Sequence, residues 1–138
     1  MDAYWNEVYD GSLRVILRSA PAGISPDWAT FSKSGDLINV DNVDNTIGSY
    51  NSIRVYLWAG MMSPRDPSYR LLKNHFQPMV RLTEQLNMPP EKVNVNTLEV
   101  NQAAGDGFGA CLLPYLGNSK TAEFVRTVLL NSPIEKDN

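Results

Sequence analysis

The stretch "SYNSIRVYLWAGMM" (residues 49–62) begins with polar residues and then places apolar side chains on almost every side of a helical wheel. A helix that is apolar all round is typical of one that other helices enclose. We therefore predict a helix from Ser49 to Met62, with Ser49 as its N-cap residue. Trp58 lies in the apolar part of this helix, and we expect it in the hydrophobic core.

The first turn of this helix carries a phenol, an amide and a guanidinium, from Tyr50, Asn51 and Arg54. Such groups need polar partners at the entrance of an enclosed helix, because burying an unpaired guanidinium is very costly. One interpretation is an internal network, in which Arg54 pairs with an acid and Tyr50 is a hydrogen-bonded core tyrosine. The other is a ligand cleft into which the N-terminus of the helix opens. These residues alone leave both interpretations open.

The other segments indicate a mainly α-helical chain with short β accessories. Apolar spacing and helix stop signals predict four further helices and one hairpin. Pro78 falls inside one of these helices and should kink it or split it in two. The expected elements are a helix from Ala3 to Ser19 capped by Asp2, a helix from Asp66 to Asn87, a hairpin over residues 92–101, and helices over residues 107–117 and 120–131.

Residues 21–48 are rich in Pro, Gly, Asp and Asn, which forbids a long helix there. Short extended pieces are possible at Trp28–Phe31 and Leu37–Val40. A connection of this length is rarely passive, so we expect it to carry function or to cover another part of the molecule.

The composition and charge of the chain disfavour several classes of function. A net charge of −3 over 138 residues gives no cationic field, which disfavours a nucleic-acid partner. The single cysteine, Cys111, excludes an intrachain disulfide and a cysteine-cluster metal site, and we expect no metal or other cofactor. His75 is the one histidine, and no activated nucleophile can be placed beside it from the sequence. No apolar run is long enough for a membrane span, and the N-terminus does not read as a signal peptide.

Four segments carry a resemblance to a known family. In order, "SAPAGISPDW", "SYNSIRVYLWAGMM", "FQPMVRLTEQLNMPPEKVNV" and "GFGACLLPYL" resemble the later part of glycoside hydrolase family 8, in particular its bacterial endoglucanases, over about residues 4–130. The resemblance implies an all-α fold, a partial (α/α)6 barrel with about five of its twelve helices and a cellulose-binding groove. Residues 1–138 would then form a partial catalytic domain without the N-terminal half and the last helix.

The resemblance also implies a chemistry, namely inverting hydrolysis of β-1,4-glucosidic bonds by two carboxyl groups. The family's acid is a glutamate in early helices, for which this chain has no counterpart. Its base is an aspartate directly after the tyrosine of the "SY" pair, where this sequence has Asn51. An amide cannot accept the proton of the attacking water, and loss of a positioned base typically lowers the rate by about 10²- to 10⁴-fold. Asp41 and Asp44 are conceivable substitutes for the base.

Tyr50 and Arg54 match residues that line the cleft in the family. Trp28 is either a platform for a sugar ring or a packing residue beneath the loop. We therefore expect an endoglucanase-like glycosidase, bound to β-1,4-glucan, whose activity is absent or very weak in this form. The alternative is a non-catalytic fragment that binds glucan or assists assembly. By resemblance the location is periplasmic or secreted, and an unclosed barrel would favour self-association.

Overall fold

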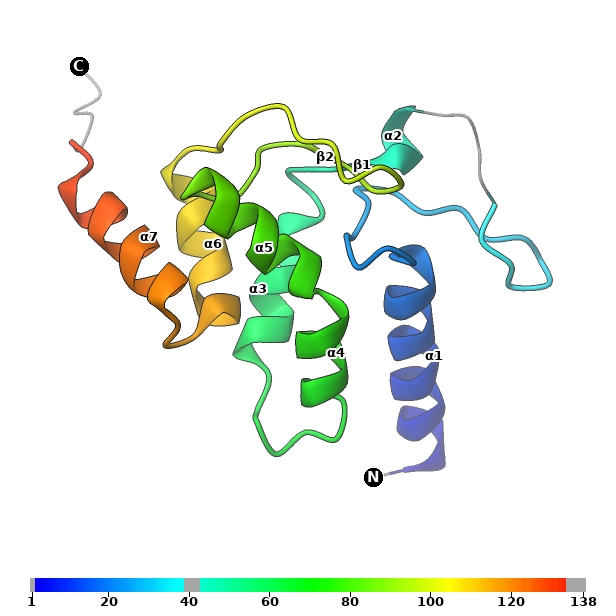
Figure 1. Ribbon diagram of the computed structural model, residues 1–138. Coiled ribbons are helices and arrows are strands. Elements are labelled where there is room, and N and C mark those ends of the chain that lie inside the picture. Colours follow the sequence, from blue (N-terminus) through cyan, green and yellow to red (C-terminus); the bar gives the residue numbers. More distant parts are fainter. Residues whose placement is uncertain (1, 39–42, 134–138) are drawn as a thin grey trace, which may run out of the picture.

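The computed structural model describes residues 2–38 and 43–133, and within these the protein is mainly helical, as predicted. Figure 1 shows α3 and α6 near the middle, α4 and α5 in front of them, and α1 and α7 on opposite sides. The elements are α1 (Ala3–Ser19), α2 (Val43–Thr46), β1 (Ile47–Gly48), α3 (Ile53–Met61), α4 (Tyr69–His75), α5 (Gln77–Leu86), β2 (Val93–Asn94), α6 (Asp106–Leu116) and α7 (Lys120–Asn131).

The core is centred on the contact between α3 and α6. Tyr56 and Tyr115, one from each helix, are fully buried with their rings edge to face, 6.0 Å between centroids. Gly60 allows the close approach, because a Cβ atom there would overlap the backbone of Pro114 and Tyr115. Phe76 completes the cluster, with its ring 5.1 Å from that of Tyr56. A glycine at this crossing is therefore a packing requirement.

The start of α3 differs from the prediction. The helix begins at Ile53, residues 49–52 form a turn, and the buried Ser49 hydroxyl has no hydrogen-bond partner among the described residues. Ser49 is therefore not the side-chain cap. The N–H groups that a cap would satisfy are bound by a carboxylate far away in sequence, that of Asp27.

The prediction of an enclosed helix is also wrong for part of α3. Trp58 is 64% exposed, and Met61 beside it is exposed too. The buried residues Ile53, Tyr56 and Ala59 follow a single stripe, which packs against the rest of the core. Apart from Arg54 the helix is apolar all round, but the described residues of this chain cover only one of its faces.

The split of the third predicted helix is confirmed. Its first half is α4 and its second half is α5, with the break at Phe76. Pro78 lies in the first turn of α5, where its missing N–H disrupts no helical hydrogen bond. Asn87 ends α5 in the left-handed conformation, with φ of 62°.

The predicted hairpin is present, and its pairing extends over residues 89–104. The N–H of Asn94 donates to the carbonyl of Glu99 at 2.8 Å, and Val93 pairs with Val100. One pairing was not predicted: β2 also pairs antiparallel with β1, with Ile47 opposite Asn94. This joins the end of the long loop to the hairpin beside the start of α3. A Phe31–Leu37 bridge supports extended pieces in the loop, whereas Val40 lies outside the described residues.

Candidate functional site

The turn before α3 is held by a single carboxylate. Asp27 Oδ1 accepts the backbone N–H groups of Ser49 at 2.9 Å, Asn51 at 2.9 Å and Ser52 at 2.7 Å. The N–H of Asp27 donates to the carbonyl of Ile47 at 2.8 Å, which fixes the loop against β1. A carboxylate is favoured at a helix N-terminus by both the exposed N–H groups and the helix dipole. Asp27 therefore fixes the backbone that presents the candidate site residues.

A buried hydrogen bond anchors the same loop from the other side. The N–H of Ser25 donates to the hydroxyl of Tyr56 at 2.9 Å, and both residues are buried. Burial also raises the pKa of Tyr56, because the phenolate would lose its hydration. The loop at residues 25–28 is thus joined to the turn before α3 and, in the core, to α3 itself.

Asn51 and Arg54 contact each other within the site. The guanidinium Nη2 of Arg54 donates to Oδ1 of Asn51, and the Arg54 side chain is exposed. Among the described residues, Arg18 and Asp36 form an ion pair at 3.2 Å, and Arg54 forms none. These residues therefore do not support the interpretation in which Arg54 pairs with an acid. The amide oxygen of Asn51 is thus the hydrogen-bond acceptor of Arg54 in this turn.

Tyr50 lies on the surface, with 61% of it exposed, and is not a core tyrosine. Its ring meets Phe108 edge to face, 5.0 Å between centroids at 89°. Its hydroxyl donates to Oε1 of Glu91 at 3.4 Å, and Glu91 Oε2 accepts from Gln102 Nε2 at 2.6 Å. The phenol therefore stands beside a carboxylate of the hairpin, which the sequence pattern does not single out.

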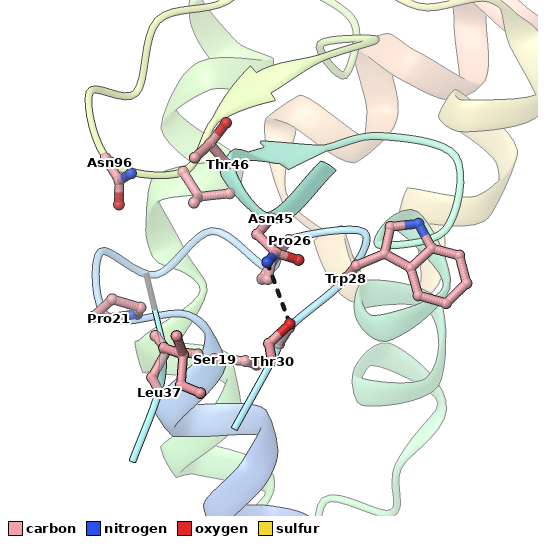
Figure 2. A pocket seen from close by; sticks show the side chains of 12 residues that line it. Ser19, Pro21, Pro26, Trp28, Thr30, Leu37, Asn45, Thr46 and Asn96 are labelled. Atoms are coloured by element: carbon pink, nitrogen blue, oxygen red, sulfur yellow. Dashed lines mark hydrogen bonds between the residues drawn. The ribbon is translucent and has the colours of Figure 1, made fainter. Parts of the chain in front are cut away.

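Trp28 directly follows Asp27 and is also 61% exposed, so it is not a packing residue beneath the loop. It lies at the edge of a pocket of about 140 Å³ formed by the long loop, the end of α1 and the tip of the hairpin. Figure 2 shows its indole to one side, well away from Pro21 and Leu37 across the pocket, while Asn45 bonds Thr30 at 3.3 Å. An exposed indole of this kind is available to a sugar ring.

A second, apolar cavity of about 260 Å³ lies between α1, α3 and α4. Arg54 and Trp58 line it from α3, with Ile16 from α1 and Leu72 from α4. The exposed face of α3 thus borders an open apolar space. It lies on the flank of the site, and its lining is almost entirely apolar although Arg54 is one of the residues that form it.

The remaining candidates take no part in this arrangement. His75 Nε2 is buried without a hydrogen-bond partner among the described residues, and its ring packs edge to face on Phe76. Cys111 is a partly buried free thiol that packs against the core. Asp41 lies outside the described residues, as does the side chain of Asp44. The described part of the chain holds no group of three metal-binding side chains, and none of its helices is long and apolar enough to cross a bilayer.

The structure therefore brings Asn51 and Arg54 into contact, while the neighbouring Tyr50 contacts Phe108 and Glu91 instead. The backbone before Trp28 is joined to the same turn through Asp27. Sequence reasoning missed Asp27 and Glu91. Both belong to recognisable motifs, "SPDW" and "PPEK", but their partners are distant in sequence. The sequence signal that could have indicated Asp27 is its position directly before Trp28 in the long loop.

Comparisons with known proteins agree with this arrangement. The family described as "Glycosyl hydrolases family 8" matches residues 1–129. The chain is 39% identical to an endoglucanase of Escherichia coli (strain K12) over 117 residues, which is 84% of this chain and 31% of the relative. It is 41% identical to an endoglucanase of Salmonella typhi, with the same two shares covered.

A solved structure is also similar. The endo-1,4-D-glucanase of Vibrio fischeri ES114 superposes with a TM-score of 0.80 at 34% identity, covering 94% of this chain and 38% of that protein. The helices of this chain therefore have the arrangement of part of an (α/α)6 barrel, as the sequence resemblance implied. The chain spans about a third of the length of the relatives it matches.

Proposed function

Because the chain belongs to glycoside hydrolase family 8, we propose that it is part of an endo-β-1,4-glucanase-like hydrolase whose turn at residues 49–54 binds a β-glucan chain. Hydrolysis by this chain alone is absent or very weak. The chain covers 31% of the length of an endoglucanase relative, so the proposal rests on the site and not on the activity of the whole relative.

One observation supports the proposal: the neutral amide Asn51 follows the tyrosine of the "SY" pair, where the resemblance to the family implies the catalytic base. Inversion requires a carboxylate that takes a proton from water on the face of the sugar opposite the leaving group. Asn51 has no basic lone pair for that proton, and its Oδ1 is already bound to Arg54. Asn51 can orient a water molecule or a sugar hydroxyl but cannot act as the base.

Binding is the role that this turn retains. Tyr50 offers an exposed phenol ring, and Arg54 offers donors next to the Asn51 amide. Trp28 adds an exposed indole on the adjoining loop. Aromatic faces that contact the C–H surface of glucose, together with planar polar groups for its hydroxyls, form the usual composition of a sugar site.

A second candidate function is a non-catalytic fragment that binds glucan or assists assembly. The exposed apolar face of α3 favours it, because Trp58 and Met61 border an open apolar cavity. Contiguous exposed apolar surface of this kind promotes self-association. Sedimentation of the purified chain over a concentration range tests this, and a monomer at all concentrations would refute self-association. The family resemblance also supports a periplasmic or secreted location.

Hydrolysis assays on soluble cellulose derivatives test the catalytic part of the proposal. The purified chain should release reducing ends no faster than a buffer control, and turnover comparable to an intact endoglucanase would refute the loss of activity. Asn51→Asp is the informative variant. Hydrolysis should rise with this change if a general acid is present, and should stay at background if none is.

A further inference from the structure

We propose that Glu91 is a glucan-binding residue: its carboxylate accepts hydrogen bonds from the hydroxyls of a glucose unit that lies beside Tyr50, and Gln102 positions that carboxylate. This inference rests on the proposed function, because it extends the glucan site from the turn at residues 49–54 to the hairpin at residues 89–104.

The geometry places Glu91 at the exposed phenol. Tyr50 donates to Oε1 at 3.4 Å, a long and therefore weak contact that a shorter hydrogen bond from another hydroxyl can replace. Phe108 packs against the Tyr50 ring and fixes its orientation, while most of the tyrosine remains exposed. A sugar ring that contacts Tyr50 therefore brings its hydroxyls within reach of Oε1.

The chemistry of the carboxylate suits hydroxyl donors. An ionised carboxylate has about four acceptor positions, of which Tyr50 and Gln102 occupy two. Both partners are neutral, and among the described residues no cation forms an ion pair with Glu91. Its charge is therefore free to strengthen hydrogen bonds from glucose hydroxyls, which are stronger to an ionised acceptor than to a neutral one.

Gln102 fixes the carboxylate through the hairpin. The two residues face each other across it, since the N–H of Glu91 donates to the carbonyl of Gln102 at 3.0 Å. The Gln102 amide then donates to Oε2 at 2.6 Å, which leaves Oε1 directed to Tyr50. The hairpin itself is fixed beside the turn by the pairing of β2 with β1. Gln102 is therefore a positioning residue.

The negative charge of Glu91 should also make the site discriminate between neutral and acidic sugars. A carboxylate that accepts from sugar hydroxyls favours a neutral glucan and repels a sugar that carries its own carboxylate. The site should therefore prefer unsubstituted β-1,4-glucan over a uronic acid polymer with the same linkage. Neutralising Glu91 should reduce this preference.

Calorimetry with cellopentaose on the folded chain tests the inference. Glu91→Gln should raise the Kd about five-fold or more, since a hydrogen bond to a charged group typically contributes more than one to a neutral group. The matched control is Glu99→Gln, the same neutralisation in the same hairpin at an exposed residue that bonds Thr97. This control should leave the Kd unchanged, and circular dichroism verifies that each variant is folded.

Two further measurements distinguish a role of Glu91 in glucan binding from a purely structural role. Gln102→Ala should weaken binding in the wild-type chain but have no further effect in Glu91→Gln, because it acts only through that carboxylate. An oligomer of β-1,4-linked glucuronic acid should bind less tightly than cellopentaose to the wild-type chain, and this difference should shrink in Glu91→Gln.

The outcomes distinguish this inference from the proposed function. If the wild-type chain binds cellopentaose and Glu91→Gln binds equally well, the role of Glu91 is refuted and the glucan site at Tyr50 stands. If the folded wild-type chain does not bind cellopentaose at all, both are refuted. Equal weakening by Glu91→Gln and Glu99→Gln would indicate a general charge effect and would also refute the specific role.

Discussion

The two faces of α3 are both built from apolar residues, but one is buried and the other is exposed. One face, with Tyr56 and Gly60, is in tight contact with α6 and its Tyr115. The other face, with Trp58 and Met61, is exposed and borders an apolar cavity. Apolar composition therefore does not determine burial, because burial also requires a partner surface that fits. Substitutions on the two faces should have very different effects.

The largest effect is expected at Gly60. Gly60→Ala should destabilise the fold by about 3 kcal/mol or more, because the added methyl would overlap the backbone of α6. Gly11→Ala is the matched control, since nothing lies within 4 Å of a Cβ atom at Gly11 in α1. That change should stabilise the protein by up to about 1 kcal/mol through helix propensity.

Urea denaturation of the two glycine variants measures both changes. Opposite signs for Gly60→Ala and Gly11→Ala are the predicted result. Similar unfolding free energies for the two variants would contradict the tight contact between α3 and α6.

The next largest effect on stability is expected in the turn at residues 49–52, which precedes α3. Asp27→Ala should lower the free energy of unfolding by about 2 kcal/mol, because three backbone N–H groups lose their shared acceptor. Asp27→Asn keeps an acceptor oxygen and should lose less. Thermal unfolding followed by circular dichroism measures the series, and equal Tm values for wild type and Asp27→Ala would refute this capping role.

Tyr56→Phe removes the buried acceptor of the Ser25 N–H and should cost about 1–2 kcal/mol at pH 8. The contribution of the Tyr56 phenol to stability should also depend on pH, and the direction of that dependence can be derived. Burial raises the pKa of Tyr56 in the folded state above its ordinary value of 10.0, so folding favours the protonated phenol. That stabilisation is complete below about pH 10 and is lost as the pH rises further.

Urea denaturation at pH 8 and pH 11 tests this prediction. The wild-type chain should lose more stability between these two pH values than Tyr56→Phe does. Tyr115, whose pKa burial also raises, and Tyr9, whose pKa the hydrogen bond to Asp66 raises, are present in both proteins and contribute to the sensitivity that remains in the variant. An identical pH dependence of the two proteins would exclude Tyr56 as a contributor.

The smallest effect is expected on the open face. Trp58→Gln should change the free energy of unfolding by no more than about 0.5 kcal/mol, because the indole is exposed in the chain. If the open face also mediates self-association, the variant should sediment as a smaller species than wild type at high concentration. A loss of stability of about 3 kcal/mol would show that Trp58 is buried after all.

The helices predicted from the sequence agree with the structure where the signals are local. The split at Pro78 and the bounds of α6 and α7 follow from proline chemistry, glycine stops and apolar spacing. The turn at residues 49–52 could not be predicted in this way, since its cap comes from Asp27 across a long loop. The pairing of β1 with β2 is likewise non-local, because each strand has only two residues.

The candidate site was predicted in part. The polar turn was recognised because a phenol, an amide and a guanidinium are unusual at the start of an apolar helix. The exposure of Trp58 was not, because a helical wheel reports which residues are apolar and not which are covered. Glu91 was missed because its relation to Tyr50 arises only when the hairpin packs beside the turn.

The central claim is that the turn at residues 49–54 binds glucan without cleaving it. Its most direct test is an NMR titration of the labelled chain with cellopentaose, which reports the amide signals of that turn and the anomeric protons of the sugar together. We predict saturable shifts at Tyr50, Asn51 and Arg54 and no new reducing-end signals over many hours. Unchanged amide signals, or hydrolysis as fast as that of an intact endoglucanase, would contradict the claim.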